Sequence, residues 1–417
     1  MLFLKKILLI TNNALIDGDA NGRTLGALLE GYPKDYLIQF CTNGNSVDSK
    51  YIVNAYKFSD KDAIRSVFKP ICNCKKLAVD KGEIGKVTSE VRVKKTSAVI
   101  FAREIIWKTI VPRLDLINIA EEFAPDIILL QLGACAFTAK IAYDLTVKLN
   151  AKLIIFTTED YYFKKWNYID PGKRNAFFFF ISYRYKKMLK KIFRKAECCI
   201  CNTPFLAKMY EQEFGAKTRV IMNAANKIKS NEDNVIDEYK IVYAGNLGLE
   251  RYVSLIDIAK EIYKISTKFH LDIYGEFSQE IIARIKNEPN LRLKGFATYQ
   301  DVLMEMASAK LVLHMESLKE FYAKDLRAAF STKIPDSLAC QTPLFLYAPE
   351  NLAETKYLEE NKCAFVCTKH EDLHLIVKQA LTNEKMRALI LKNAEDVVNR
   401  NHTHETIQKN FMGALEI

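Results

Sequence analysis

Several common signatures of function are absent from this 417-residue chain. No two CxxC pairs occur among its ten cysteines, which argues against a zinc ribbon and fits free thiols in a reducing compartment. The first histidine is His270, and the six histidines show no spacing typical of a metal site or a catalytic triad. No apolar run approaches the roughly 20 residues needed to span a bilayer. We therefore expect neither a metal nor another cofactor.

The amino-terminal residues carry no convincing export signal. Lys5 and Lys6 interrupt the apolar run 2–10, so a first buried strand is expected there. The formal net charge of +11 indicates an acidic partner, and nucleic acid, an anionic membrane and nucleotide phosphates all qualify. We expect a cytoplasmic protein that can rest on the inner face of the cell membrane.

Strand-like and helix-like segments alternate twice along the chain. In the first series, strands are expected at 6–11, 36–41, 124–132, 151–157, 198–202 and 218–222. A polar stretch follows, and strands then recur at 240–244, 269–274, 291–295, 311–314, 344–348 and 364–367. This alternation predicts an α/β fold of two Rossmann-like domains facing a central cleft. The predicted domains are 1–223 and 240–382, joined by a linker at 224–239.

The segment Phe330–Pro343, FSTKIPDSLACQTP, has the pattern of a helix start that holds phosphate. Ser331 or Thr332 can cap the helix, and Lys333 adds a full positive charge beside the free N–H groups. Asp336, one turn later, can accept hydrogen bonds from hydroxyl groups. An ordinary capped helix explains the same pattern equally well.

Glycine turns follow the first strand of each series. Gly245, Asn246 and Arg251 form a turn that can cradle a phosphate and clamp it, although a plain tight turn is the commoner reading. The amino-terminal loop, with Gly18 and Gly22, allows close approach of a ligand to the backbone.

Carboxylates follow two further strands. Glu159 and Asp160 come directly after the strand 151–157, where they can bind sugar hydroxyls or polarise an acceptor; a solvated loop is an equal alternative. Glu316 follows the strand 311–314, and we expect it to face the cleft. His314, inside that strand, is expected to be an ordinary core histidine.

The segment 176–195, AFFFFISYRYKKMLKKIFRK, is basic and amphipathic. Such a helix is typical of binding to an anionic membrane surface. A core-packed helix with a solvated basic face is nearly as good an explanation.

Taken together, these motifs resemble the carboxyl-terminal half of a family-four glycosyltransferase of the GT-B type. The matching strings are YAGNLG at 243–248 with Arg251, DIYG at 272–275, KGF at 294–296, HMES at 314–317, and FSTKIPDSLACQTP. The resemblance implies transfer of a sugar from a nucleotide-diphosphate sugar to a polysaccharide or lipid-linked glycan. It also implies retention of configuration, no metal, and a role in bacterial capsule or lipopolysaccharide synthesis.

The resemblance also assigns roles to residues. Asp336 matches the second acidic residue of the family's Glu-x7-Glu motif, which contacts the donor ribose. The residues that match the family's diphosphate neighbourhood are Ser331, Thr332, Lys333, Gly245, Asn246 and Arg251. The loop near the sugar and the acceptor is matched by Gly18 and Gly22. Glu159, Asp160, Arg251 and Glu316 are the candidates for the catalytic step. By the same resemblance, one carboxyl-terminal helix spanning 383–417 packs on the first domain.

Two departures from the family pattern keep alternatives open. Ala328 stands where the first motif glutamate is expected, and the first domain has no histidine to place near the sugar. The main alternative is therefore a catalytically degenerate nucleotide-sugar binding protein of the same fold. A nucleotide-sugar epimerase and a nucleic-acid binder are further alternatives; no nucleic-acid recognition module is apparent, and nucleic acid is not the expected partner.

Overall fold

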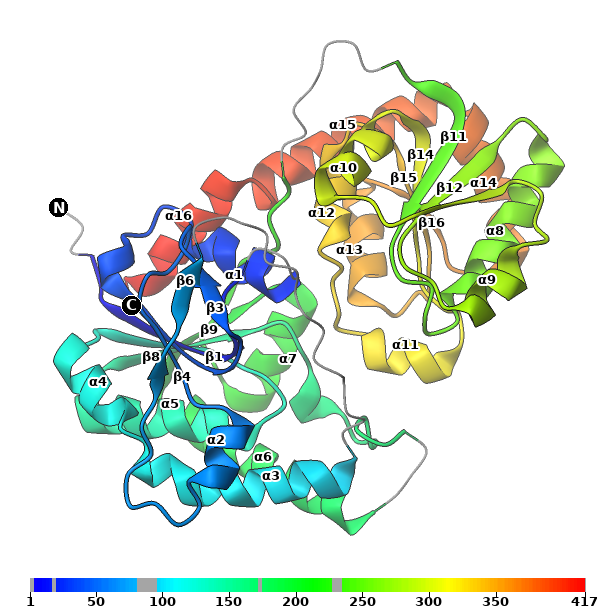
Figure 1. Ribbon diagram of the computed structural model, residues 1–417. Helices are drawn as coiled ribbons and strands as arrows, with labels where there is room; N and C mark the ends of the chain where they lie inside the picture. Colours follow the sequence, from blue (N-terminus) through cyan, green and yellow to red (C-terminus); the bar gives the residue numbers. More distant parts are fainter. Residues whose placement is uncertain (1–3, 17–19, 81–95, 172–174, 227–234, 417) are drawn as a thin grey trace. The chain divides into compact units, whose positions relative to one another are not determined.

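A computed structural model describes residues 4–16, 20–80, 96–171, 175–226 and 235–416 (Figure 1). The chain divides into two compact units, the first formed by Met1–Met222 with Ile407–Ile417 and the second by Asn223–Thr406. Each unit is an α/β domain built on a largely parallel sheet, which confirms the predicted fold class.

The first unit contains an eight-stranded sheet in the order β10-β9-β8-β7-β1-β2-β4-β5. Its strands are β1 (Ile7–Asn13), β2 (Leu37–Asn43), β4 (Ala55–Lys57), β5 (Lys75–Lys76), β7 (Ile127–Gln131), β8 (Lys152–Thr157), β9 (Ala196–Cys201) and β10 (Thr218–Val220). All neighbours pair in parallel except β4 and β5. Because β1, β7 and β8 are almost entirely buried apolar runs, they occupy the centre of the sheet.

Helices pack around this sheet. They are α1 (Ala20–Leu29), α2 (Asp60–Arg65), α3 (Ser97–Ile110), α4 (Leu116–Phe123), α5 (Ala136–Leu149), α6 (Ala176–Phe193), α7 (Pro204–Phe214) and α16 (His404–Leu415). Helices α3, α5 and α6 contact one another. A short parallel pair, β3 (Ser46–Asp48) with β6 (Ala78–Asp80), lies outside the main sheet.

The second unit has a six-stranded parallel sheet in the order β13-β12-β11-β14-β15-β16. The strands are β11 (Asp237–Ala244), β12 (His270–Tyr274), β13 (Leu291–Gly295), β14 (Ala309–Met315), β15 (Leu344–Tyr347) and β16 (Phe365–Cys367). Numbered within the unit, this is the order 3-2-1-4-5-6 of a dinucleotide-binding domain. The sheet order reverses between β11 and β14, and ligands bind beyond the strand ends at such a point.

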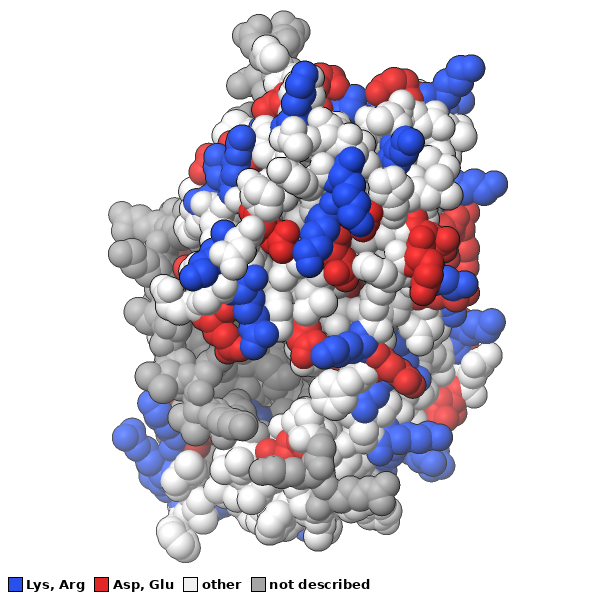
Figure 2. Space-filling model, turned by 90° about the vertical axis from the view of Figure 1, so that its right-hand side faces the viewer, with Lys and Arg blue, Asp and Glu red and all other residues white. Residues whose placement is uncertain are grey.

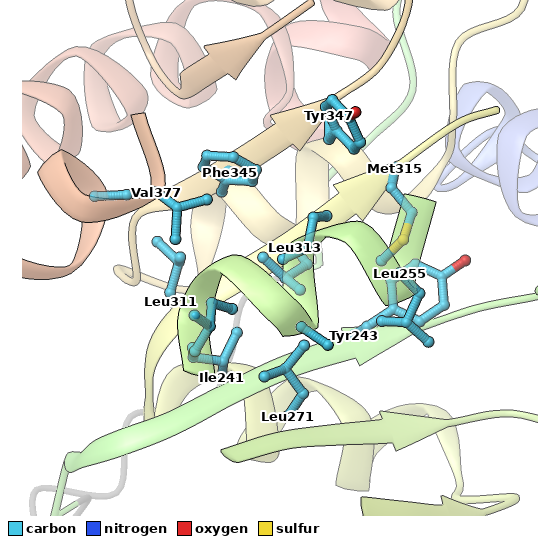
Figure 3. Packing of buried hydrophobic residues seen from close by; sticks show 14 of the residues in the cluster. Ile241, Tyr243, Leu255, Leu271, Leu311, Leu313, Met315, Phe345, Tyr347 and Val377 are labelled. Carbon is cyan, nitrogen blue, oxygen red and sulfur yellow. The ribbon is translucent and has the colours of Figure 1, made fainter. Parts of the chain in front are cut away.

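Helices α8 (Arg251–Ile265) and α14 (Leu373–Thr382) contact each other over one part of this sheet. The remaining helices of the unit are α9 (Gln279–Ile285), α10 (Tyr299–Ala307), α11 (Glu320–Leu326), α12 (Lys333–Ala339), α13 (Ala353–Asn361) and α15 (Glu384–Asn401). Figure 3 shows side chains of β11, β12, β14 and β15 meeting Leu255 of α8 and Val377 of α14. This dry core fixes the strand ends that carry the candidate site.

Several boundaries differ from the sequence-based prediction. Strand β11 begins at Asp237, inside the predicted linker 224–239. The predicted helix within 383–417 is two helices, α15 and α16, and α15 belongs to the second unit. Within the described ranges, no helix is both long and apolar enough to cross a membrane.

Candidate functional site

The candidate site is formed where β11 and β14 end beside each other. Gly245 follows β11 directly, and Glu316 follows β14 directly. These strands are in register from Ile241↔Leu311 to Tyr243↔Leu313, so their carboxyl ends lie at one edge of the sheet. The topology alone therefore brings together a glycine turn and a carboxylate that lie about 70 residues apart in sequence.

Arg251 and Glu316 form a two-pronged ion pair across this edge. Nε of Arg251 donates to Oε2 of Glu316 at 2.7 Å, and Nη2 donates to Oε1 at 2.9 Å. The Arg251 side chain is 17% exposed and that of Glu316 8% exposed. Such paired hydrogen bonds fix the plane of the guanidinium. Both residues were predicted as catalytic candidates, and the structure shows that they hold each other.

The environment of the pair shifts the pKa of both groups. Burial raises the pKa of Glu316, and the nearby Glu354 carboxylate adds to the rise, although the Arg251 hydrogen bond opposes it. Burial lowers the pKa of Arg251, but its hydrogen bond to Glu316 and the negative charge of that group raise it overall. Because the two-pronged geometry requires an acceptor-only carboxylate, we take the pair to be ionised.

Lys333 reaches the glycine turn from the start of α12. Its Nζ would lie 2.6 Å from a Cβ atom added to Gly245, so a side chain there would displace the ammonium group. Gly275, the glycine of the DIYG string, has φ +153°, and a Cβ there would lie 2.5 Å from the Gly245 carbonyl oxygen. Glycine at both positions thus permits the close approach of the turn, the neighbouring strand end and Lys333.

Glu354 of α13 ties the segment before α12 to β14. Its Oε1 lies 3.2 Å from Nε2 of His314, and its Oε2 accepts a hydrogen bond from the Ser331 backbone N–H at 3.3 Å. All three residues are buried or partly buried. The Ser331 N–H is therefore already paired, and His314 is the core histidine that the sequence predicted.

The start of α12 differs from the predicted phosphate-binding helix. Thr332 makes no capping hydrogen bond through its side chain; the Ser331 hydroxyl instead accepts from the Lys333 N–H at 3.3 Å. The helix has only seven residues, so its dipole is a minor source of positive potential. The full positive charges at this edge come from Lys333 and from Arg251, which is paired with Glu316.

Asp336 is engaged with the backbone that precedes the second sheet. Its side chain is buried, and Oδ1 accepts a hydrogen bond from the Asn226 backbone N–H at 3.1 Å. Asn246 is also committed locally, because its Oδ1 pairs with the Gly248 N–H. The observed contacts give both residues a clear part in holding backbone, while their predicted contacts with the donor stay predictions.

His314, Glu316 and Glu354 place possible ligand atoms within 4.8 Å of one another. Metal binding here would compete with existing contacts, because Glu316 pairs with Arg251 and Glu354 pairs with both His314 and Ser331. A neighbouring guanidinium also repels a divalent cation. The three side chains are better described as an internal hydrogen-bonded network.

The first unit carries a second ion pair at the end of β8. Lys164 Nζ lies 3.5 Å from Oδ1 of Asp160, and the side chains are only 7% and 2% exposed. The ammonium also lies over the rings of Tyr161 and Tyr168. Burial raises the pKa of the neighbouring Glu159, and the positive charge of Lys164 opposes that rise.

The amino-terminal glycines are placed only in part. Gly18 lies outside the described residues. Gly22 is buried in the first turn of α1, which begins at Ala20, so the prediction that it belongs to a loop is wrong. Near the end of β1, the side-chain amide of Asn12 lies so close to Gly133 that a Cβ atom added to this glycine would contact it.

Sequence reasoning missed Glu354 and Lys164. Glu354 sits in an ordinary helical pattern, and only the tertiary fold brings it to Ser331 and His314. Lys164 had a detectable signal, since it lies four residues after Asp160 and is followed by aromatic residues. No pattern in the sequence shows that this pair is buried.

Comparisons with known proteins agree with this architecture. A family model described as "Glycosyl transferase-like" matches residues 254–413. No curated protein matches the chain significantly. Among solved structures, HepE of Anabaena in complex with UDP is 14% identical, with 99% of each chain covered and a TM-score of 0.61.

Two further structures show the same likeness. WaaG, a glycosyltransferase involved in lipopolysaccharide biosynthesis, is 11% identical, with 97% of this chain and 98% of WaaG covered and a TM-score of 0.58. Sucrose-phosphate synthase of Thermosynechococcus elongatus is 12% identical, with 98% of each chain covered and a TM-score of 0.60. The fold is GT-B, and fold and family match together support the resemblance to GT-B glycosyltransferases. The narrower placement in family four stays a prediction.

Proposed function

We propose that this protein transfers a sugar from a nucleotide-diphosphate sugar to a polysaccharide or lipid-linked glycan. The observation that carries the proposal is that Lys333 Nζ lies against the Gly245 turn at the end of β11, while Arg251, at the start of the next helix, pairs with Glu316 after β14. Two cations at the reversal point of the second sheet suit a diphosphate. HepE has been solved with UDP, with UDP and glucose, and with UDP-glucose, which favours a UDP-sugar as the donor.

In the proposed reaction the nucleotide diphosphate is the leaving group. Lys333 places an ammonium against the turn, and Arg251 offers Nη1, since its Nε and Nη2 are held by Glu316. Both cations stabilise the negative charge that grows on the diphosphate as the glycosidic bond breaks. Glu316 acts through Arg251, as a positioning residue, by fixing the guanidinium plane before the donor arrives.

Transfer with retention and without a metal belongs to the same proposal. Positive charge from Lys333 and Arg251 can supply the role that a divalent cation plays for a diphosphate elsewhere. On the acceptor side, Glu159 is the better placed of the predicted carboxylates, because Asp160 is already paired with Lys164. The acceptor would be made at the inner face of the cell membrane, so a cytoplasmic, peripheral location is part of the proposal.

The alternative is a catalytically degenerate protein that binds the nucleotide sugar but does not transfer the sugar. It is favoured by Ala328, which is buried where the family has a glutamate. Glu316 and Glu320 are the nearest preceding glutamates in sequence; Glu316 is engaged with Arg251 and Glu320 is exposed at the start of α11. Donor binding without turnover is the outcome that this alternative predicts.

A two-part experiment separates these functions. Thermal-shift measurements with UDP, GDP, ADP and CMP identify the base, since a ligand at about 100 times its dissociation constant adds about 2.7 kcal/mol. Release of the nucleotide from the matching sugar donors, with membrane-extracted glycans as acceptors, then measures turnover. Binding with acceptor-dependent release supports the transferase. Binding with no release under any acceptor supports the degenerate protein, and no binding to any nucleotide contradicts both.

A further inference from the structure

Helix α6 uses only one side for packing within the first unit. The buried stripe of the helix contains Phe178, Ile181, Tyr185, Leu189, Ile192 and Phe193. Helices α3 and α5 lie beside it (Figure 1). The core-packed explanation of the segment 176–195 therefore accounts for this stripe and leaves the opposite side of the helix unexplained.

The amino-terminal half of α6 exposes aromatic rings. Four large side chains are 44% to 64% exposed: Phe177, Phe179, Phe180 and Tyr183. Phe101 of α3 packs against two of them, with ring centroids 5.2 Å from Phe177 and 5.1 Å from Phe180. Val99, on the same helix α3, is half exposed. Exposed apolar residues that gather across two adjacent helices mark an interaction surface.

The carboxyl-terminal half of α6 borders a basic hollow of about 700 Å³. Its lining consists of Tyr162, Tyr183, Lys186, Lys187, Lys190, Lys191 and Arg194. No carboxylate is among these residues. Within the described part of the chain, none of the five cations forms an ion pair with a carboxylate. Tyr183 contributes to both the exposed aromatic cluster and the hollow, so the two are continuous.

This concentration of one charge differs from the mixture of charges over much of the molecular surface. Across the face drawn in Figure 2, basic and acidic side chains are interspersed, as on an ordinary solvated surface. By contrast, the segment 176–195 contains no aspartate or glutamate. Much of the net charge of +11 is therefore gathered on one helix, next to exposed aromatic rings.

We propose that α6, with the adjoining end of α3, docks on an anionic lipid bilayer. In this arrangement Phe177, Phe179 and Tyr183 enter the interface between head groups and acyl chains, and the lysines around the hollow bind lipid phosphates. A bilayer fits better than nucleic acid because the exposed residues include an aliphatic side chain, Val99, as well as aromatic rings. An aliphatic side chain is stabilised in an apolar phase but cannot stack on bases. The inference rests on the proposed function only for the cellular location.

The test is flotation of the full chain with vesicles of phosphatidylcholine alone or mixed with equimolar phosphatidylglycerol. Binding to the mixed vesicles alone, weakened by about 0.5 M salt, is the expected result. Neutralising four lysines in K186Q/K187Q/K190Q/K191Q should lower the partition coefficient by about 100-fold or more. The double variant F177S/F179S should lower it at least about tenfold without changing the charge.

Matched controls exist in the second unit. K260Q/K286Q/K378Q/K385Q removes the same charge from exposed lysines, and L375S/L389S removes exposed apolar side chains. Both should bind the mixed vesicles like the unaltered protein. A UDP thermal shift in every variant reports folding and the donor site separately, so failure of the proposed function would not be mistaken for failure of docking.

The proposal is overturned if the unaltered chain fails to float with mixed vesicles, or if the control variants lose binding as much as the α6 variants. A salt-sensitive complex with a single-stranded oligonucleotide, lost in the lysine variant but unchanged in F177S/F179S, would identify nucleic acid as the occupant if vesicles are not bound. Loss of vesicle binding in both α6 variants, with both controls intact, supports the bilayer.

Discussion

Each unit of the protein holds a buried ion pair at the carboxyl ends of its parallel strands, and the two pairs differ in construction. In the second unit, Arg251 and Glu316 lie far apart in sequence and join by two short hydrogen bonds. In the first, Asp160 and Lys164 lie four residues apart at a single distance of 3.5 Å. The Arg251–Glu316 pair links the start of α8 to the end of β14. The Asp160–Lys164 pair closes a local loop.

The difference favours the second unit for the proposed anion binding. Glu316 holds Nε and Nη2 of Arg251, so Nη1 is the part of the guanidinium that a phosphate would use in the proposed reaction. Lys164 is enclosed by Tyr161, Tyr168 and Asp160, and its charge is already balanced. The same type of fold thus carries a different kind of ion pair in each unit.

Breaking the Arg251–Glu316 pair should have the largest effect. Arg251→Ala removes a donor contact and leaves Glu316 buried without its cation, so we expect about 100-fold less transfer and a loss of about 3 kcal/mol in the free energy of unfolding. Glu316→Gln keeps a neutral partner and should cost less stability while still misplacing the guanidinium. Nucleotide-release kinetics and urea unfolding measure both. Full activity in Arg251→Ala would remove its proposed role.

Breaking the Asp160–Lys164 pair should affect stability alone. Asp160→Ala leaves the Lys164 ammonium buried, and the expected loss is about 3 kcal/mol in the free energy of unfolding, with UDP affinity unchanged. Lys164→Met in the same background should restore part of the loss because the unpaired charge is gone. Weaker UDP binding in a folded Asp160→Ala protein would mean that the two units are not as different as described.

Acidification should destabilise the second unit, which contains the buried His402. Burial lowers the pKa of His402 to about 4 from its usual value of 6.5, while its hydrogen bond to the Asn223 carbonyl opposes the shift. As pH falls, His402 is therefore protonated in the unfolded chain at a higher pH than in the folded protein. Stability present above pH 6.5 should decline by up to about 3 kcal/mol towards pH 4.

The control for this pH dependence is His402→Gln, which should flatten the decline between pH 6.5 and pH 4. Hydrogen exchange can assign the loss to the second unit. An equally steep decline in the variant would show that carboxylates, and not His402, govern the acid response.

A small change at the glycine turn should have the smallest effect. Gly245→Ala would bring the new Cβ within 2.6 Å of the Lys333 Nζ and 2.9 Å of the Tyr243 hydroxyl. The tip of a lysine moves easily but the buried Tyr243 ring must shift, so we expect a loss of about 1 kcal/mol in the free energy of unfolding, while UDP affinity falls about tenfold, or about 1.4 kcal/mol. Gly413→Ala, which meets open space, is the matched control. Calorimetric titration with UDP measures both.

Much of the fold was predictable because buried parallel strands are continuous apolar runs. Strand β13 has the predicted bounds, and β8 begins one residue after its predicted start. The short strands β3 to β6 were missed, since runs of two or three residues with exposed charges, such as Lys75–Lys76, carry no hydrophobic pattern. Predicting one long helix within 383–417 was wrong because α15 ends at Asn401, where His402 is buried by contacts that lie far away in sequence.

The candidate site was predictable at its strand ends and not in its pairing. Gly245 and Glu316 directly follow β11 and β14, so the topology of the sheet predicts that they lie at one edge. Arg251 donates hydrogen bonds to Glu316, and Glu354 accepts one from the Ser331 N–H. Both contacts depend on how far side chains extend between elements, so no sequence pattern predicts them. Of the two predicted capping residues, Ser331 accepts the Lys333 N–H through its hydroxyl, and Thr332 makes no capping hydrogen bond.

The most direct test of a diphosphate site in the second unit is calorimetric titration of UDP into the full chain and into Lys333→Ala. Lys333 is only partly buried, so its truncation should leave the fold intact. We predict measurable UDP binding that weakens by at least about tenfold in the variant, with an unchanged melting temperature in the absence of ligand. Equal UDP affinity in both proteins would contradict the account.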